Sequence, residues 1–351
     1  MSIFTVDSII IKEDIIREIE KGVIKMQDYQ KLFDTMMQDY EITVKKALDG
    51  EIKSFCYLQK KDKEWGICDK NYQNRLGLSY VLIFFEEKLE KAKLEPLVRR
   101  LFQEELKDRT TDSFQGIGQA LNNLTYLLAK YQRQEDNALF EQAKHANFDC
   151  YCGYEVPKTG EKMQLFDSIE DMIYVAIDLR ETKTAIELIE IWKQQQVILT
   201  LNHYHTLLYW MKQLEQDDDV LLCRKQILEL TKKEKDEWDC CSAYMGYIQA
   251  LIERKDFEQA SELFLQMIPR LPLAKQNWYS FGLGKTVLEG CVDLILCQNV
   301  YAEYLWLWVK PYIKRTSGQF PRILYQKAIK AAKQMHSEKL QKRLEEQKRK
   351  L

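Results

Sequence analysis

The sequence predicts an all-α protein, on the basis of its composition and the spacing of its apolar residues. Gly and Pro number only 13 and 6 among 351 residues, too few for the turn-rich connections of an all-β protein. Leu, Lys, Glu, Gln and Ile dominate, and most of them favour helices or tolerate them well. Apolar residues recur at helical spacing nearly throughout, without an alternating strand pattern of useful length. The apolar share of 46% supplies a core and argues against disorder.

The first part of the chain is predicted to form helices over 9–23, 29–48, 76–93 and 96–107. Asp49-Gly50 is suited to end the second of these helices. Residues 59–74 lack a period and predict a loop with room for a short turn of helix. Pro96 fits the first turn of its helix, where its missing N–H costs nothing.

The pattern becomes more regular further along the chain, where helices are predicted in successive pairs. The predicted helices are 113–131, 135–147, 166–180, 182–195, 203–215, 218–232, 239–254, 256–269, 276–297, 300–314 and 320–350. Residues 149–162 form an irregular segment. The last helix, which ends in KLQKRLEEQKRKL, is charged on all sides and is expected to be a solvated cap.

One stretch has the pattern of a complete 34-residue helix–turn–helix repeat. Its large, small and terminating residues are Tyr244, Tyr247, Leu251, Phe257, Ala260, Phe264, Met267 and Pro272. The crowded small position at Ala260 has equivalents at Cys223 and Ala185, separated by 37 and 38 residues. A small side chain there lets the second helix of a pair approach the first. Trp278-Tyr279-Ser280-Phe281-Gly282 opens another unit in the W-x2-L-G manner.

On these residues the chain resembles the tetratricopeptide-repeat (TPR) family over roughly residues 113–315, with degenerate repeats. The resemblance implies a right-handed α-solenoid of helix–turn–helix repeats, in which each hairpin buries its apolar face against its neighbours. The expected organisation is an N-terminal helical region over 1–110, TPR-like repeats over 111–319 and a C-terminal capping helix over 320–351. A generic helical bundle would also suit this spacing of apolar residues.

The resemblance also implies a binding groove lined by the first helix of each repeat. Carried over by register, the expected partner-binding residues are Glu170, Tyr174, Leu208, Lys212, Met245, Gln249, Tyr279 and Leu283. Such a mixture of aromatic, amide and apolar groups suits an amphipathic helix or an extended peptide. Only Lys212 would serve in a clamp for a carboxylate terminus, so that mode is not supported. The alternative is that Tyr174, Met245 and Tyr279 merely pack between adjacent hairpins.

The leading functional hypothesis is a non-catalytic protein- or peptide-binding module. One alternative is a peptide-sensing regulatory domain, although residues 1–60 lack a convincing helix-turn-helix for binding DNA. Another is an immunity- or inhibitor-type protein that masks the active site of a partner enzyme. The partner is expected to be a protein or peptide, and no cofactor is expected.

Few motifs point to catalysis. Cys150 and Cys152 could ligate zinc, form a redox pair, or be two semi-buried thiols of a loop, and the sequence lacks a second pair with metal spacing. The Gly284-Lys285-Thr286 triplet has Tyr279 where a phosphate-binding loop needs glycine. His203 and His205 would face different ways on a helix, so they cannot share a metal. The sequence thus predicts a protein that is not an enzyme.

Charge and apolar runs favour a cytoplasmic protein. The 52 basic and 54 acidic residues give a net charge of −2, too little to draw in nucleic acid or an anionic membrane. The most apolar segments, Leu76–Phe85 and Tyr301–Val309, are far shorter than the ~20 residues of a membrane span. Nine cysteines without an ordered framework are expected to be reduced thiols, and the first 20 residues lack the pattern of a signal peptide.

Overall fold

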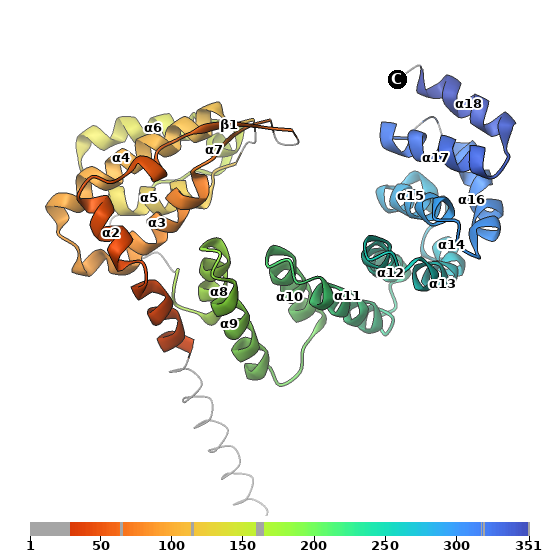
Figure 1. The fold of residues 1–351 in the computed structure, drawn as a ribbon, viewed down its shortest axis with the longest axis horizontal. Helices are drawn as coiled ribbons and strands as arrows, with labels where there is room; N and C mark the ends of the chain where they lie inside the picture. Colours follow the sequence, from red (N-terminus) through yellow and green to blue (C-terminus); the bar gives the residue numbers. More distant parts are fainter. Residues whose placement is uncertain are drawn as a thin grey trace, which may run out of the picture. The chain divides into compact units, whose positions relative to one another are not determined.

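The computed structural model describes residues 29–63, 66–113, 116–158, 165–316, 318 and 320–349. These residues are mostly helical, which confirms the prediction of an all-α fold (Figure 1). The predicted helix at 9–23 lies outside the described residues. Two compact units divide the chain, the first over Met1–Val197 and the second over Ile198–Leu351. The expected domain boundaries at residues 110 and 319 fall within these two units and not between them. They remain predictions.

Helices and one small hairpin of strands make up the first unit. Residues 29–38 are helical, and the later elements are α2 (Glu41–Leu48), β1 (Gln59–Asp62), β2 (Gly66–Asp69), α3 (Tyr72–Phe85), α4 (Lys91–Thr111), α5 (Gln119–Ala129), α6 (Asn137–Lys144), α7 (Phe148–Gly153), α8 (Ile169–Asp178) and α9 (Thr182–Gln195), with 3-10 turns at Lys53–Phe55, Glu86–Lys88 and Gln134–Asp136. Helix α5 packs against both α3 and α4. Because α3 is buried around most of its circumference, it forms the centre of this unit.

The structure corrects three local predictions in the first unit. The predicted loop at 59–74 contains the antiparallel pair β1 and β2, with Gln59 opposite Asp69 and Asp62 opposite Gly66, and the start of α3. Each strand has only four residues and neither buries an apolar face, so no alternating pattern marks them. Helix α4 begins at Lys91, which places Pro96 inside the helix and not in its first turn. The predicted irregular segment at 149–162 includes most of α7.

The second unit is a succession of helical pairs. Its elements are α10 (Leu201–Gln213), α11 (Asp217–Thr231), α12 (Glu237–Glu253), α13 (Phe257–Met267), α14 (Leu271–Ala274), α15 (Gly282–Leu296), α16 (Ala302–Thr316), α17 (Arg322–Gln334) and α18 (Glu338–Lys348), with 3-10 turns at Ile268–Arg270 and Trp278–Ser280. Within each pair α10–α11, α12–α13, α15–α16 and α17–α18, the two helices pack together. Helix α12 also packs against α15, and α15 against α17. Successive pairs therefore bury their apolar faces against one another.

The predicted single helix at 320–350 is a helical hairpin. His336 has a left-handed backbone with φ of 49° and separates α17 from α18. Leu340 and Leu344 of α18 are buried, so this charged helix packs on α17 through its apolar side. The break was missed because neither Gly nor Pro marks it, and the turn closes by a hydrogen bond from the Ser337 N–H to the Ala332 carbonyl.

The same turn closes five helical pairs. The second residue after the first helix is left-handed in each, and these residues are Arg180, Glu215, Lys255, Gln298 and His336, with φ between 49° and 64°. In four of the five turns the next residue donates its N–H to a carbonyl five positions earlier, as in a Schellman motif. One pair, α8–α9, lies in the first unit and the other four lie in the second. The hairpin is thus a repeated local structure, although its sequence is not strictly repeated.

The predicted small-residue positions follow this register in two of three pairs. Ala185 and Ala260 each lie five residues after the left-handed residue of their turn, and both are buried. The same place in α11 is Val220, and buried Cys223 lies nearly one turn further along. Equal spacing in sequence therefore did not mean equal position in the hairpin. Among the described residues, no helix has the length and apolarity that crossing a membrane would require.

Candidate functional site

The eight residues of the predicted groove lie in both units. Glu170 and Tyr174 belong to α8 of the first unit, whereas the other six belong to the second unit: Leu208 and Lys212 on α10, Met245 and Gln249 on α12, Tyr279 in the 3-10 turn and Leu283 on α15. Tyr174, Lys212 and Gln249 are exposed. Tyr279 and Leu283 are half-buried.

Two of these residues are core side chains. Leu208 and Met245 are buried, and a Cβ atom added to Gly290 would lie 2.8 Å from Met245 Cε. Met245 therefore fills the space between α12 and α15, as the alternative interpretation of the sequence held. Glu170 is exposed, but its carboxylate accepts a hydrogen bond of 2.9 Å from Trp192 Nε1–H. The binding role of the remaining groove residues stays a prediction.

Tyr279 belongs to an aromatic cluster at one end of α15 and α16. The indoles of Trp278 and Trp308 stack with centroids 5.6 Å apart and planes 7° from parallel. Tyr312 packs on both Trp278 and Tyr279, with centroids 4.9 Å and 5.4 Å away, and the Arg315 guanidinium lies 5.6 Å from the Tyr279 ring centroid. Because Trp278 is buried, the cluster fixes the start of α15, and Tyr279 forms its rim.

Large apolar side chains are exposed on α16 and in the turn that precedes it. Tyr304 and Leu307 are 57% and 71% exposed, and their spacing of three residues places them on one side of α16, whereas Val300, 84% exposed, lies in the turn just before the helix. An open groove of about 570 Å³ includes Leu307 and lies between α16 and the α17–α18 turn, lined by Gln298, Asn299, Ala302, Glu303, Trp306, Leu307, Gln334, Met335 and His336. We call these three side chains and this groove the α16 surface.

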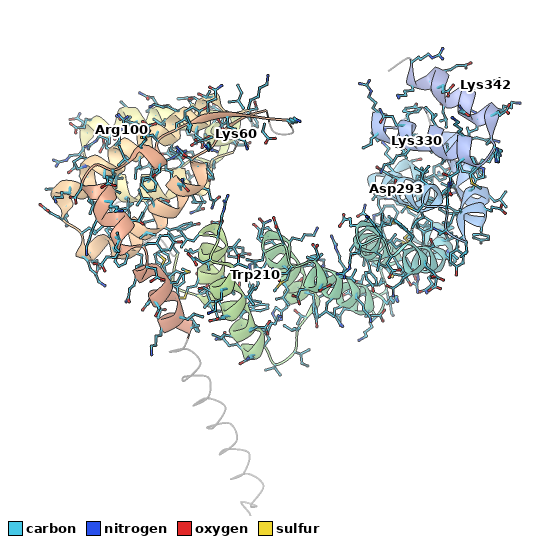
Figure 2. The ribbon with its side chains drawn as sticks, viewed as in Figure 1. Lys60, Arg100, Trp210, Asp293, Lys330 and Lys342 are labelled. Atoms are coloured by element: carbon cyan, nitrogen blue, oxygen red, sulfur yellow. The ribbon has the colours of Figure 1, made fainter. Side chains whose placement is uncertain are left out.

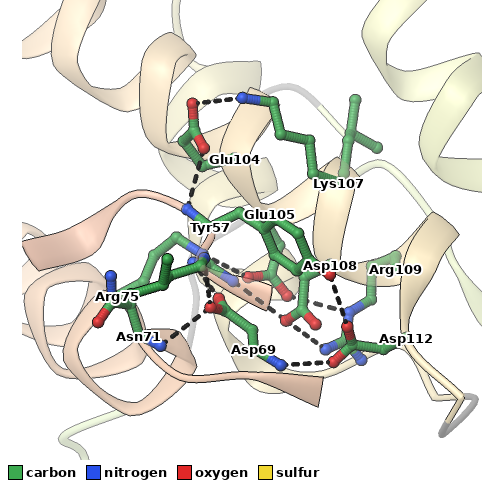
Figure 3. Close-up of polar contacts among 12 residues, drawn as sticks. Tyr57, Asp69, Asn71, Arg75, Glu104, Glu105, Lys107, Asp108, Arg109 and Asp112 are labelled. Atoms are coloured by element: carbon green, nitrogen blue, oxygen red, sulfur yellow. Dashed lines mark hydrogen bonds and ion pairs between the residues drawn. The ribbon is translucent and has the colours of Figure 1, made fainter. Parts of the chain in front are cut away.

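A buried cluster of carboxylates and arginines occupies the first unit (Figure 3). Arg75 of α3 is completely buried and pairs with three carboxylates: Nη1 is 2.7 Å from Asp69 Oδ2, Nε is 2.7 Å from Glu105 Oε2 and Nη2 is 3.0 Å from Asp108 Oδ2. Its Nη1 also donates to the Phe55 carbonyl at 3.2 Å. A buried cation needs such partners, because its removal from water otherwise costs on the order of several kcal/mol.

Arg109 and Asp112 complete this arrangement, which we call the ionic cluster. Arg109 Nη2 is 2.6 Å from Asp108 Oδ2, and its Nε lies 3.2 Å from Glu105 Oε1 without the alignment of a hydrogen bond. Asp112 accepts the Asp69 N–H at 2.9 Å and the Tyr57 hydroxyl at 3.3 Å. The ionic cluster thus contains four carboxyl groups and two guanidinium groups, and three of the carboxyl groups pair with the guanidinium groups. Burial raises the pKa of Glu105, and burial together with the Asp108 carboxyl raises the pKa of Asp112 to about 7.

Sequence reasoning missed the ionic cluster. Its signal is the run Glu104-Glu105-x-x-Asp108-Arg109-x-x-Asp112, whose members at intervals of three and four residues share one face of α4. This run resembles a solvated helix face, and the partner Arg75 lies 30 residues earlier in an apolar helix. In the described part of the chain, no three His, Cys, Asp or Glu side chains are arranged to hold a metal ion. The guanidinium groups, and not a cation site, organise these acids.

The two cysteines singled out in the sequence lie in α7. Cys150 is buried, and Cys152 is exposed on the other side of the short helix. Burial raises the pKa of Cys150, which disfavours the thiolate that zinc or redox chemistry needs. In the Gly-Lys-Thr triplet, Gly284 is buried, and a Cβ atom there would lie 2.1 Å from the Trp278 carbonyl oxygen. The glycine therefore lets the first turn of α15 pack closely against the backbone of Trp278 and Tyr279. The residues on both sides of the triplet are helical, as the sequence indicated.

No protein-family model matches the sequence, and no curated protein is significantly similar to it. Function is therefore inferred from the geometry of the chain's own residues. The α16 surface and the ionic cluster are the two features that simple core formation does not explain.

Proposed function

We propose that this chain is a non-catalytic module that binds a protein or peptide, built on degenerate TPR-like hairpins. In the proposed architecture the hairpins stack as a right-handed α-solenoid. The observation that carries the proposed function is the α16 surface, where large apolar side chains remain exposed beside an open groove. No cofactor takes part in this function.

The repeated hairpins support the TPR-like architecture. Five pairs share the left-handed turn, and first helices α12, α15 and α17 pack in succession within the second unit. Each hairpin is too small to bury its apolar face alone, so neighbours stabilise one another and leave an extended surface for a partner.

The α16 surface fits the apolar face of an amphipathic helix. Single exposed leucines are normal on a protein surface, but Tyr304 and Leu307 together on one side of α16, with Val300 exposed just before the helix, are typical of an interaction site. Tyr304 and Leu307 lie about one helical turn apart along α16. Side chains from such a partner helix would enter the groove beside Leu307, where Trp306 and Met335 provide apolar walls.

Photo-crosslinking from position 304 in native cells would identify the partner, and affinity measurements on purified proteins would test the site. Leu307→Glu should weaken binding at least tenfold, because it places a charge in the apolar contact. Leu273→Glu is the matched control: that leucine is 75% exposed in the same unit but lies outside the α16 surface. Equal affinities of the Leu307 and Leu273 variants would refute the site.

Two further variants separate the α16 surface from the groove expected from the family resemblance. Tyr174→Ala and Tyr279→Ala remove groove side chains in the first and second units. Loss of affinity in these variants, with Leu307→Glu unchanged, would move the binding site to the predicted groove. Unchanged affinity in both, with loss in Leu307→Glu, is the result expected here.

A further inference from the structure

The ionic cluster contains a carboxyl oxygen that lacks a hydrogen-bond donor. Asp108 is fully buried, and its Oδ2 forms ion pairs with both Arg75 and Arg109. Its Oδ1 is buried too, yet no donor among the described residues reaches it. Asp112 follows Asp108 by four residues and its backbone N–H donates to the Asp108 carbonyl at 3.0 Å, so the two carboxyl groups lie on the same side of the end of α4. Two carboxylates cannot form a hydrogen bond unless one of them carries a proton.

We infer that the carboxyl groups of Asp108 and Asp112 share a proton, and that this proton fastens the β1–β2 hairpin to the end of α4. A proton on Asp112 would supply the donor that Asp108 Oδ1 lacks. It would also lower the charge of the cluster from an excess of two negative charges to an excess of one. The cluster is thus a proton-binding site that controls how firmly the hairpin is held.

Asp112 is placed to pass this change on to the hairpin. Its Oδ2 accepts the N–H of Asp69, a residue of β2. Next to it, Ser113 exchanges two hydrogen bonds of 2.9 Å with Ile67, also of β2. Asp69 in turn accepts the N–H groups of Leu58 and Asn71, which flank the hairpin. Movement of Asp112 away from Asp108 would therefore loosen several backbone contacts together.

The charged and titratable groups that face this carboxyl pair come from every element around it. They are Tyr57 before β1, Cys68 and Asp69 of β2, Tyr72 and Arg75 of α3, and Glu105 and Arg109 of α4. The pKa values of Tyr57 and Tyr72 are raised to about 12, chiefly by burial, so both remain neutral at physiological pH. Burial also raises the pKa of Cys68, which keeps its thiol protonated. The carboxyl groups are the members that can change charge.

The sign of the pH dependence follows from the direction of the shift. Burial and the neighbouring Asp108 raise the pKa of Asp112 to about 7 when the hairpin is docked. When the hairpin is undocked and Asp112 is solvated, its pKa returns towards about 4. The docked state binds the extra proton between these values, so docking weakens as pH rises from 5 to 7 and then levels off. One linked proton allows at most about a tenfold change per pH unit.

Hydrogen exchange of the full chain, followed by mass spectrometry, would measure this effect. Protection factors of the peptide covering 59–69, corrected for intrinsic exchange, should fall by more than tenfold between pH 5 and 7 and then change little up to pH 8. A peptide from α12 in the second unit serves as the internal reference and should keep its protection. Equal protection of the hairpin at pH 5 and pH 7 would overturn the inference.

Two variants assign the effect to the carboxyl pair. Asp112→Asn keeps an acceptor for the Asp69 N–H and gives Asp108 a permanent N–H donor, so hairpin protection should become independent of pH. Ser113→Ala removes a hairpin contact without touching the pair, so protection should drop at every pH while its pH dependence remains. A pH dependence in Asp112→Asn equal to that of the wild type would assign the proton elsewhere and refute the proposal.

Discussion

Replacing Arg75 by methionine would test how the first unit is stabilised. Arg75 is the only cation that contacts Asp69, Glu105 and Asp108 together, at 2.7, 2.7 and 3.0 Å, within the described residues. Methionine fills much of the same volume but provides neither charge nor donors. The variant therefore leaves buried carboxylates with Arg109 as their remaining partner in the cluster.

The expected loss follows from the burial of these groups. Removing one partner of a buried ion pair costs about 3–5 kcal/mol, because the other charge stays desolvated. Since Arg109 still pairs with Glu105 and Asp108, we expect one loss of about 4 kcal/mol at pH 7. We do not expect a separate loss of this size for each of the three carboxylates. That is a large part of the ~5–15 kcal/mol that stabilises a typical domain.

The loss should depend on pH. The charge of Arg75 lowers the pKa of Glu105 against the dominant effect of burial, so the pKa of Glu105 rises further in the variant. The folded variant then binds more protons than the wild type, and its deficit in unfolding free energy grows as pH increases. We expect a smaller loss at pH 5 than at pH 7.

The unfolding free energy of the first unit can be measured from the slowest-exchanging amides of α4 in urea. Arg100→Met is the matched control. Arg100 lies on the exposed side of α4 (Figure 2), where its side chain is 52% exposed and pairs with Glu104 at 3.0 Å. This substitution should change stability by less than about 1 kcal/mol. A loss below about 1 kcal/mol in Arg75→Met, or an equal loss at both pH values, would refute this account of the ionic cluster.

Three further predictions concern local structure. Lys255→Gly should stabilise the second unit by about 0.5 kcal/mol, because its φ of 64° strains any residue with a Cβ, and the gain exceeds the entropy that glycine adds to the unfolded chain. Gly284→Ala should destabilise it by about 1–3 kcal/mol, since the new methyl group would meet the Trp278 carbonyl oxygen. Exposed Cys152 should react at once with a thiol reagent, whereas Cys291, buried and with its pKa raised by that burial, should react only on unfolding.

Each of these predictions has a control and a contrary result. Glu253→Gly, inside the last turn of α12, should destabilise by up to about 1 kcal/mol, and a similar effect of Lys255→Gly would contradict the turn argument. Gly282 has open space around its Cβ position, so Gly282→Ala should be tolerated; equal losses at 282 and 284 would refute the contact. Chemical denaturation measures all four variants. Simultaneous modification of both cysteines in the native protein would contradict their burial.

The spacing of apolar residues predicted most helices from α8 onward to within a few residues, but not how they pair at every turn. The range 182–195 matches α9 fully, and Ala185 and Ala260 are buried where the hairpins needed small residues. Cys223 is buried as well, yet its place in the hairpin differs from theirs. The turns use Arg, Glu, Lys, Gln and His in the left-handed conformation, where the sequence signal would be glycine. For that reason the break at His336 could not be seen beforehand.

The sequence by itself determined that the chain is helical, because apolar periodicity and helix propensity act over a few residues and need no distant partner. It placed Leu208 and Met245 in the partner-binding groove, whereas both are buried, because the apolar pattern alone does not separate core from groove. The tertiary structure decided which apolar residues stay exposed, and so distinguished the α16 surface from the core. It also joined Arg75 to the acids of α4, since a buried ion pair is stable only when folding brings both partners out of water together.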